Sequence, residues 1–325
     1  MIYVKYSSPD VSLNLAAEYY FATEKPLGDE IFMLWQPRPT IVVGSFQNIH
    51  EEVDVAYAVS HGIDIVRRLS GGGTVYQDNG SIQYAFIAQG DSEINFRRYL
   101  DPMIGALREL GINAEADGRN DICACGKKVS GNAQYRVGDK TVHHGTLLFS
   151  ADIGEMERAT HPPKYKISSK SIKSVRERVV NMCTLTDKVK TPCEFMEYLA
   201  EKIGGSVTYT PSEQDIKRIE HIADEKFRRE RREGLAAHSP AFCMEKTVKF
   251  DGGVLTVAFN VKNGTIESAR LLGDFFTAHD SEKLTGALTG VPFTGEAVKS
   301  AIIASGFEVM GMDNGTLAEK LSENV

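Results

Sequence analysis

The sequence of 325 residues is poor in cysteine and tryptophan, with five cysteines and a single tryptophan. The cysteines form no dense framework and no paired CxxC clusters, which argues against a disulfide-rich secreted domain and favours a reducing compartment. No stretch approaches the roughly 18 to 20 consecutive apolar residues that a membrane span requires. The N-terminus reads as a strand and lacks the charged and apolar regions of a signal peptide, so we expect a cytoplasmic protein with no membrane partner.

An excess of positive charge is also missing. The chain carries 37 lysines and arginines against 44 aspartates and glutamates, a net charge of −7. This balance argues against a general nucleic-acid-binding protein, and we expect no nucleic-acid partner. Hydrophobic residues make up 42% of the chain and charged residues 25%, as in an ordinary folded protein. At this length one hydrophobic core usually divides into two, so we expect two domains.

The pattern of apolar residues predicts an α/β (α+β) fold. Helical spacing or capping signals predict helices over 10–24, 97–110, 191–203 and from Ser212 onward. Strands are predicted over 39–44, 63–67, 82–89 (half-buried), 122–125, 128–136 and 141–149, whereas 154–178 reads as basic and irregular. Further strands (242–250, 254–261, 265–272) and short helices (281–287, 295–304) follow. We therefore predict a large domain over 1–236, with mixed sheets and flanking helices, and a small α+β domain over 237–325.

The most informative stretch runs Arg67-Arg-Leu-Ser-Gly-Gly-Gly-Thr-Val-Tyr-Gln-Asp78. A glycine triplet between two strands lets backbone N–H groups surround an anion, because no Cβ blocks close contact. The two arginines on the entering strand could meet phosphate or carboxylate oxygens. For the triplet alone, a flexible surface turn is the alternative. The loop is neither a P-loop, since no Gly-Lys-Ser/Thr follows, nor a dinucleotide fingerprint.

A second group of polar residues comprises Gly118-Arg-Asn-Asp121, Gly126-Lys-Lys-Val-Ser-Gly131-Asn-Ala and His143-His-Gly-Thr-Leu-Leu148. A lysine before Ser-Gly on a strand would set its ammonium against a carboxylate or an acyl phosphate and stabilise developing negative charge. An exposed hairpin lysine is the alternative, and we favour it for Lys127. The two histidines lack a third ligand at convincing spacing, so zinc is not favoured. Cys123 and Cys125, two apart on a strand, are interpreted as buried core thiols.

In this order and at these separations, the motifs resemble the lipoate–protein ligase A family of the biotin/lipoate protein ligase superfamily. The resemblance includes Asn14-Leu-Ala-Ala-Glu18, Pro39-Thr-Ile-Val-Val-Gly44 with Gln47-Asn48, and Ser174-Val-Arg-Glu-Arg-Val-Val-Asn181. The segment from Asp251-Gly-Gly to Gly273-Asp274 is similar to the family's small C-terminal domain. The similarity therefore covers nearly the whole chain.

The resemblance implies an ATP-dependent lipoate–protein ligase with a biotin/lipoate-ligase-type catalytic domain. Lipoate and ATP would first give lipoyl-AMP and pyrophosphate. The lipoyl group would then pass to a specific lysine of a lipoyl domain in a 2-oxo-acid dehydrogenase complex (E2), or of the glycine cleavage H protein. A basic stretch offers a docking edge for such acidic partners: Lys164, Lys166, Lys170, Lys173, Arg176 and Arg178. A solvated loop is the alternative for this stretch.

The resemblance also assigns roles by motif. The nucleotide phosphates and the adenylate would be held by Arg68, Gly73, Thr74, Val75 and Tyr76. Lys128 would be the catalytic residue, binding the lipoyl carboxylate and then the mixed anhydride. Asn120 and Asp121 would lie near the phosphates and Mg²⁺, with Asp121 as metal ligand, and His144 would line the same pocket. Adenylation joins two anions, so positive charge and positioning would supply most of the acceleration.

Three departures from the family pattern stand out. Gln77 replaces the usual histidine and cannot act as an acid or base, Gly80-Ser81 replaces Gly-Asn, and Phe227-Arg-Arg-Glu-Arg-Arg232 replaces a Trp-rich segment. The alternatives are an ATP-independent octanoyl or lipoyl transferase with a cysteine nucleophile, an inactive lipoate-binding scaffold, and a biotin–protein ligase, whose Gly-Arg-Gly-Arg loop is missing. ATP consumption with lipoate would separate a ligase from the transferase and the scaffold.

Overall fold

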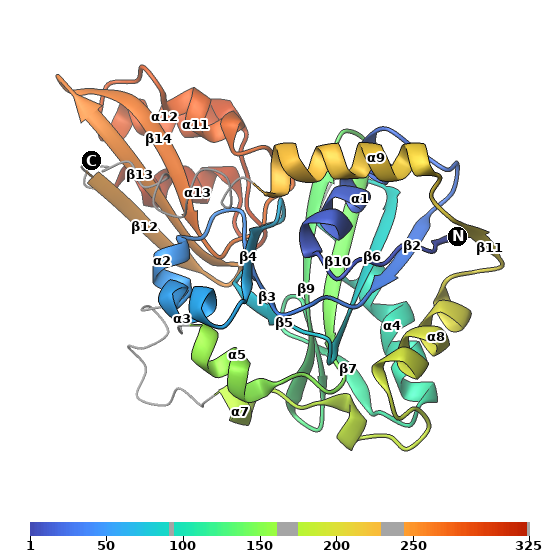
Figure 1. The fold of residues 1–325 in the computed structure, drawn as a ribbon. Coiled ribbons are helices and arrows are strands. Elements are labelled where there is room, and N and C mark those ends of the chain that lie inside the picture. Colours follow the sequence, from blue (N-terminus) through green and yellow to red (C-terminus); the bar gives the residue numbers. More distant parts are fainter. Residues whose placement is uncertain (91–93, 161–174, 229–243, 324–325) are drawn as a thin grey trace.

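The computed structural model describes residues 1–90, 94–160, 175–228 and 244–323. A large unit built on an eight-stranded sheet lies beside a smaller unit that holds the last strands and helices (Figure 1). The predicted α/β class is confirmed. The predicted domain boundary at residues 236 and 237 lies outside the described residues. Within the described ranges, no helix is long and apolar enough to cross a membrane.

The large sheet has the strand order β11-β1-β2-β6-β10-β9-β8-β7. β1 pairs in parallel with β2 and β11, and every other neighbouring pair is antiparallel. The strands are β1 (Ile2–Val4), β2 (Ile31–Trp35), β6 (Ser81–Gln89), β7 (Ala114–Asp117), β8 (Asp121–Ala124), β9 (Lys127–Val137), β10 (Lys140–Leu148) and β11 (Val207–Tyr209). The last three predicted strands of this domain are confirmed as β8, β9 and β10.

Helices cover both faces of this sheet. α4 (Arg97–Glu109) and α8 (Pro192–Ile203) pack against one face, and α1 (Val11–Thr23) and α9 (Glu213–Ile222) against the other (Figure 1). The prediction that β6 is half-buried is wrong, because eight of its nine residues are buried. Tyr84 and Phe86 join the core under α4, while Ala85 and Ile87 join the core under α1.

The helix ends follow the sequence signals. The Thr191 side chain accepts a hydrogen bond from the Glu194 amide, with Pro192 at the first helical position of α8. Ser212 and Asp215 form a reciprocal capping box at the start of α9, and a π-helical turn extends that helix to Phe227. The four helices predicted for this domain are therefore confirmed.

A second, three-stranded sheet of order β4-β3-β5 carries the glycine loop. Its strands are β3 (Thr40–Val43), β4 (Asp64–Arg67) and β5 (Val75–Gln77), and the helices beside it are α2 (Ile49–Glu52), α3 (Val55–Ser60) and α5 (Ile153–Ala159). The loop spans the turn from β4 to β5 and faces the large sheet. The prediction that 154–178 is irregular is wrong at both ends, since α5 and α7 (Val175–Arg178) are helical; residues 161–174 lie outside the described residues.

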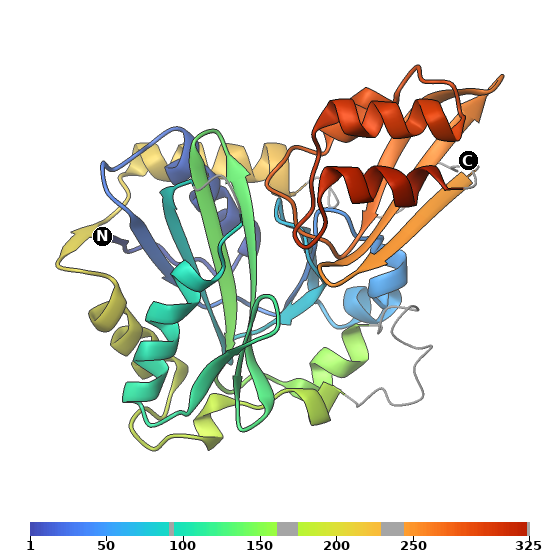
Figure 2. The ribbon, with the colours of Figure 1, turned by 180° about the vertical axis from the view of Figure 1, so that it is seen from behind.

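The small unit is an antiparallel sheet with helices on one face (Figure 2). It comprises β12 (Met244–Phe250), β13 (Gly253–Lys262), β14 (Thr265–Gly273), α11 (Glu282–Leu288), α12 (Gly295–Ser305) and α13 (Asn314–Ser322). The three strands and first two helices were predicted, and α13 was not. The segment after β14 returns to the large unit, where Phe276 joins the core that contains Phe96.

Candidate active site

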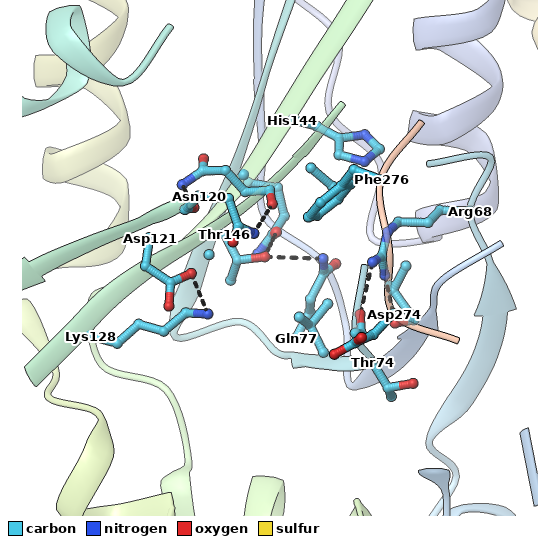
Figure 3. A pocket seen from close by; sticks show the side chains of 18 of the residues that line it. Arg68, Thr74, Gln77, Asn120, Asp121, Lys128, His144, Thr146, Asp274 and Phe276 are labelled. Atoms are coloured by element: carbon cyan, nitrogen blue, oxygen red, sulfur yellow. Dashed lines mark hydrogen bonds and ion pairs between the residues drawn. The ribbon is translucent and has the colours of Figure 1, made fainter. Parts of the chain in front are cut away.

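A pocket of about 300 Å³ lies between the large sheet and the glycine loop (Figure 3). β9, β10 and β5 supply its walls, and the segment after β14 closes one side. Its polar lining includes Arg68, Thr74, Gln77, Gln83, Arg119, Asn120, Asp121, Lys128, Asn132, His144, Thr146, Arg178 and Asp274. Its apolar lining includes Val11, Leu15, Trp35, Val42, Val75, Ala133 and Phe276. A ligand with one charged end and one apolar end matches such a lining.

Lys128 and Asp121 form an ion pair at the polar end of the pocket, with 2.7 Å between Nζ and Oδ1. They lie on adjacent strands, β9 and β8, whose register shifts between Ile122 and Cys123. A Cβ added to Gly131 would lie 2.7 Å from the Lys128 Nζ, so glycine at this position leaves room for the ammonium. The main chain of Lys128 is held by the Val180 amide, which donates to its carbonyl oxygen.

Asn120 and Asn132 lock the loop before β8 onto β9. The Asn132 amide and its side-chain Nδ2 both donate to the Asn120 carbonyl, at 3.0 and 2.9 Å. The Asn120 side chain donates back to the Asn132 carbonyl. These bonds fix the carboxylate of Asp121, the next residue, relative to the strand that carries Lys128.

The Arg68 guanidinium is buried against the glycine loop. Nη2 donates to the carbonyl oxygens of Gly71 and Gly73, at 2.7 and 2.8 Å, and Nη1 donates to the carbonyl of Val42. Burial, followed by the neighbouring charge of Arg67, lowers the pKa of Arg68 to about 10, so its side chain remains cationic at neutral pH. In this structure, Arg68 therefore holds the loop that was expected to bind phosphate.

Side chains on β5, β6 and β10 form a polar strip across the middle of the pocket. Gln77 Nε2 lies 3.3 Å from Thr146 Oγ1, which donates to Gln83 Oε1 at 2.6 Å. The Gln77 Oε1 is buried and has no hydrogen-bond partner among the described residues. Beside this strip, the Thr74 hydroxyl donates to Gln47 Oε1 at 2.6 Å. Gln77 therefore keeps a buried acceptor without a partner among the described residues, at the position where the resemblance leads us to expect histidine.

The neighbouring histidines face opposite sides of the sheet. His144 lines the pocket and bonds to Ser70 and Glu18, whereas His143 stacks on Tyr99 at 4.8 Å inside an aromatic cluster. Burial, followed by the electrostatic effect of the neighbouring His144 ring, lowers the pKa of His143 well below its usual value. No group of three histidine, cysteine or acidic side chains in the described ranges is placed to hold a metal ion. The geometry gives no support to zinc at this pair.

The small unit contributes directly to the pocket. Arg119 lies over the Phe276 ring, 4.4 Å from its centroid, and donates to the Asp274 carbonyl. The Gly72 amide donates to the Phe275 carbonyl at 3.2 Å. Gly72 has a φ of +87°, and an added Cβ would meet the Phe276 ring at 2.6 Å, so only glycine allows this approach.

Of the nine residues expected at the site, eight line the pocket: Arg68, Gly73, Thr74, Val75, Asn120, Asp121, Lys128 and His144. Tyr76 does not, because it points from β5 into the core of the β4-β3-β5 layer. Cys123 is buried as expected, but Cys125 is exposed, since β8 ends at Ala124 and Cys125 lies in the following turn at a φ of +53°. The prediction of two core thiols is therefore wrong for Cys125.

Several site residues received no role from the sequence. Glu18, Arg119 and Asp274 stand inside motifs quoted for the resemblance, so their motifs were the available signal. Phe276 lies in the segment that follows β14 and has no local signal. Ser70 belongs to the glycine-loop motif, but only the fold brings it to His144.

Fold and site together define an α/β protein with a pocket, lined by charged and apolar side chains, where the two units meet. Family models match both parts: the lipoyl protein ligase A/B catalytic domain over residues 10–204 and the bacterial lipoate protein ligase C-terminus over residues 239–312. The chain belongs to the lipoyl protein ligase A/B family, and it is a ligase enzyme.

The relatives span almost the whole chain. Lipoate–protein ligase 1 of Staphylococcus aureus is 37% identical over 90% of each chain, and the lipoate-protein ligase LplJ of Bacillus subtilis is 36% identical over 86% of this chain and 87% of its own. The P. falciparum LipL1 structure in complex with lipoate covers 95% of both chains at 19% identity, with a TM-score of 0.71. A lipoate-protein ligase A structure bound with ATP covers 69% of this chain and 94% of its own at 23% identity, with a TM-score of 0.59. These two structures share the fold.

Proposed function

We propose that this protein activates lipoate with ATP to form lipoyl-AMP and then transfers the lipoyl group to a lysine of a carrier domain. The observation that carries the proposal is the ion pair of Lys128 and Asp121, which faces the glycine loop across one pocket. The family membership supports the reaction class, and LipL1 and lipoate-protein ligase A were solved with lipoate and with ATP. A transferase that uses no ATP would not need to bind nucleotide phosphates at this loop.

The lining supports an orientation for lipoate. Its aliphatic chain and dithiolane ring would lie along Val11, Leu15 and Trp35, which form an apolar wall. Its carboxylate would meet Lys128, which would exchange the Asp121 carboxylate for that of the substrate. Because a lysine ammonium is a compact charge on a flexible stem, it can follow the acyl group from carboxylate to mixed anhydride.

For adenylation, two anions have to approach each other. Lys128 would offset the charge of the lipoate oxygen that attacks the α-phosphorus, and pyrophosphate would leave. In the transfer step, the neutral amine of the acceptor lysine attacks the carbonyl of lipoyl-AMP, AMP leaves, and the amine releases a proton to water. Lys128 would stabilise the negative charge that develops on the carbonyl oxygen. Gln77 can accept a hydrogen bond from a ligand N–H but supplies no proton transfer.

The pocket lining suits Mg²⁺ better than a metal that needs an all-protein cage. Mg²⁺ is usually held by one or two carboxylates together with substrate phosphates and water, and the side chains of Asp121 and Asn120 both line the polar end of the pocket. These two residues would hold the ion. When bound, it would neutralise part of the phosphate charge. We also propose the division into domains at 236/237 and the cytoplasmic location that the sequence predicts.

We propose acidic lipoyl domains as acceptors, from E2 of 2-oxo-acid dehydrogenase complexes or as glycine cleavage H protein. A bipartite ligase from Thermoplasma acidophilum was solved as a lipoylation system with its E2 lipoyl domain. Arg178 of α7 is exposed and lines the pocket, so positive charge is available where an acidic partner would insert its lysine. Lys164, Lys166, Lys170 and Lys173 of the proposed docking edge lie outside the described residues.

Pyrophosphate release and acceptor mass, measured with lipoate, Mg·ATP and a panel of lipoyl domains, test the proposal. We expect pyrophosphate only when lipoate and ATP are both present, with a lipoyl-sized mass gain on at least one acceptor. Acylation without ATP from an octanoylated carrier would instead establish the transferase. If the protein neither consumed ATP nor transferred an acyl group with any combination of substrates, the inactive lipoate-binding scaffold would be the remaining alternative.

A further inference from the structure

A buried chain of hydrogen bonds runs from α1 to the glycine loop. Glu18 Oε2 lies 2.9 Å from His144 Nδ1, His144 Nε2 lies 2.7 Å from Ser70 Oγ, and Ser70 Oγ lies 2.9 Å from Arg68 Nε. Glu18 and Ser70 are fully buried, and both His144 and Arg68 are less than a tenth exposed. We call Glu18, His144, Ser70 and Arg68 the relay.

The direction of every bond in the relay follows from its one unambiguous donor, Arg68, together with the need of the buried Ser70 hydroxyl for an acceptor. Arg68 Nε can only donate, so Ser70 Oγ accepts. The only other partner of Ser70 Oγ among the described residues is His144 Nε2, so the buried hydroxyl proton is satisfied when Nε2 accepts it. A neutral imidazole that accepts at Nε2 carries its proton at Nδ1, and this proton is donated to the Glu18 carboxylate. All donors therefore point from Arg68 toward Glu18, an arrangement in which each bond polarises the next.

The serine, histidine and glutamate resemble a hydrolytic triad, but Ser70 is not placed to be a nucleophile. Its side chain is fully buried and does not line the pocket. One of its lone pairs is occupied by Arg68 Nε–H. Ser70 and Glu18 reach the pocket only through His144 and Arg68, which line it.

The far end of the relay sets the shape of the glycine loop. Arg68 Nη2 binds the carbonyls of Gly71 and Gly73, and in a trans peptide the next N–H points the opposite way. The Gly72 N–H accordingly points away from the Arg68 guanidinium and donates to the Phe275 carbonyl. By the same geometry the N–H of Thr74, a residue that lines the pocket, points away from the guanidinium, and we expect it to face an incoming anion.

We propose that Glu18, His144 and Ser70 are positioning residues that hold Arg68, and through it the glycine loop, in the form that binds the phosphates of ATP. The inference rests on the proposed function for the identity of that ligand. In this proposal Arg68 sets the conformation of the glycine loop, whereas Lys128 stabilises the charge that develops during the reaction.

Ser70→Ala removes the middle of the relay without touching the ligand, and Ser70→Thr restores the hydroxyl. Ser12→Ala is the matched control, because Ser12 is equally buried on α1 and its Oγ has no hydrogen-bond partner in the described part of the chain. We expect Ser70→Ala to raise the KM for ATP about tenfold, the equivalent of one lost hydrogen bond to a charged group. The KM for lipoate should stay within about twofold, Ser70→Thr should recover most of the loss, and Ser12→Ala should match the wild type.

Nitrogen-15 NMR of His144 in the ligand-free protein supplies a readout that needs no activity. We expect a protonated Nδ1 and an unprotonated Nε2 in the wild type, and in Ser70→Ala a shifted Nε2 signal together with a shifted Thr74 amide signal. A protonated Nε2 in the wild type, or an unchanged KM for ATP in an active Ser70→Ala enzyme, would overturn the relay. If the wild type consumed no ATP, the proposed function would fail, and the NMR signals alone would decide on the relay.

Discussion

The ammonium of Lys128 lies 2.7 Å from the Oδ1 of Asp121, across two strands whose register shifts beside the pair. About a third of each side chain is exposed. Ion pairs this accessible contribute roughly 0–1 kcal/mol to stability, so the pair is easily exchanged for contacts with a ligand. The ion pair therefore fixes the position of the Lys128 ammonium, although it contributes little to the stability of the fold.

The cysteines near Lys128 provide a test against the transferase alternative. We expect the double substitution Cys123→Ser and Cys125→Ser to retain at least half of the ATP-dependent lipoylation rate, because no thiol enters the proposed reaction. Cys125 is exposed in a turn, and burial with a hydrogen bond to Asp117 raises the pKa of Cys123 to about 11, which disfavours a thiolate. Acceptor mass gain measures the rate, and a fall of a hundredfold in a folded double variant would favour a cysteine nucleophile.

His143 should make the protein less stable in acid. Its folded-state pKa lies well below that of the unfolded chain, so unfolding takes up a proton below about pH 6.5. The stabilisation is complete above that pH and is lost as the pH falls, by up to about 1.4 kcal/mol per pH unit for one proton. Urea unfolding at pH 7, 6 and 5 should show this slope.

The matched variant His143→Phe keeps an aromatic ring in the cluster of Tyr99 and Phe96 but cannot take up the proton. We expect its stability to fall less between pH 7 and pH 5 than that of the wild type. Equal slopes in the two proteins would mean that His143 does not control the acid sensitivity.

Phe276 should hold the small unit against the pocket. Its ring is fully buried, packs against Phe96 and lies under Arg119, so Phe276→Ala should cost about 3–5 kcal/mol. We also expect faster hydrogen exchange at the Gly72 amide, which donates to Phe275. Phe293→Ala is the control, because Phe293 is half-buried and packs against the core of the small unit. Unchanged Gly72 exchange in Phe276→Ala would show that another contact docks the unit.

The sequence predicted the elements whose signals are local. α4 and α8 carry an apolar stripe and clear ends, and β9 and β10 are long strands joined by a tight turn, so each was found nearly to its boundaries. The burial of β6 was underestimated, because Gln83 and Ala85 read as an outer face until α1 and α9 cover it. Short strands such as β5 and β11 have only three residues and too little periodicity to be seen.

The candidate site was predictable as a set of motifs but not as an arrangement. Eight of the residues predicted from the motifs line one pocket. The prediction for Tyr76 is wrong, because side chains alternate along a strand and the Tyr76 ring lies on the face of β5 opposite to Val75 and Gln77. The glycine loop was read as a phosphate cradle with Arg68 as an anion ligand. Only the fold reveals that the guanidinium is already bound to loop carbonyls and that Ser70 meets His144. Contacts between residues far apart in the chain leave no local pattern.

The central claim is that Lys128 stabilises both the adenylate and its transfer. A single-turnover experiment with lipoate, Mg·ATP and a lipoyl domain, in which lipoyl-AMP and acceptor mass are both quantified, tests it most directly. We expect Lys128→Ala to fold and melt like the wild type, yet to lose lipoyl transfer by at least a hundredfold. Lys127→Ala, the neighbour whose side chain does not line the pocket, should behave as the wild type. Near-wild-type transfer by a folded Lys128→Ala protein would contradict the account.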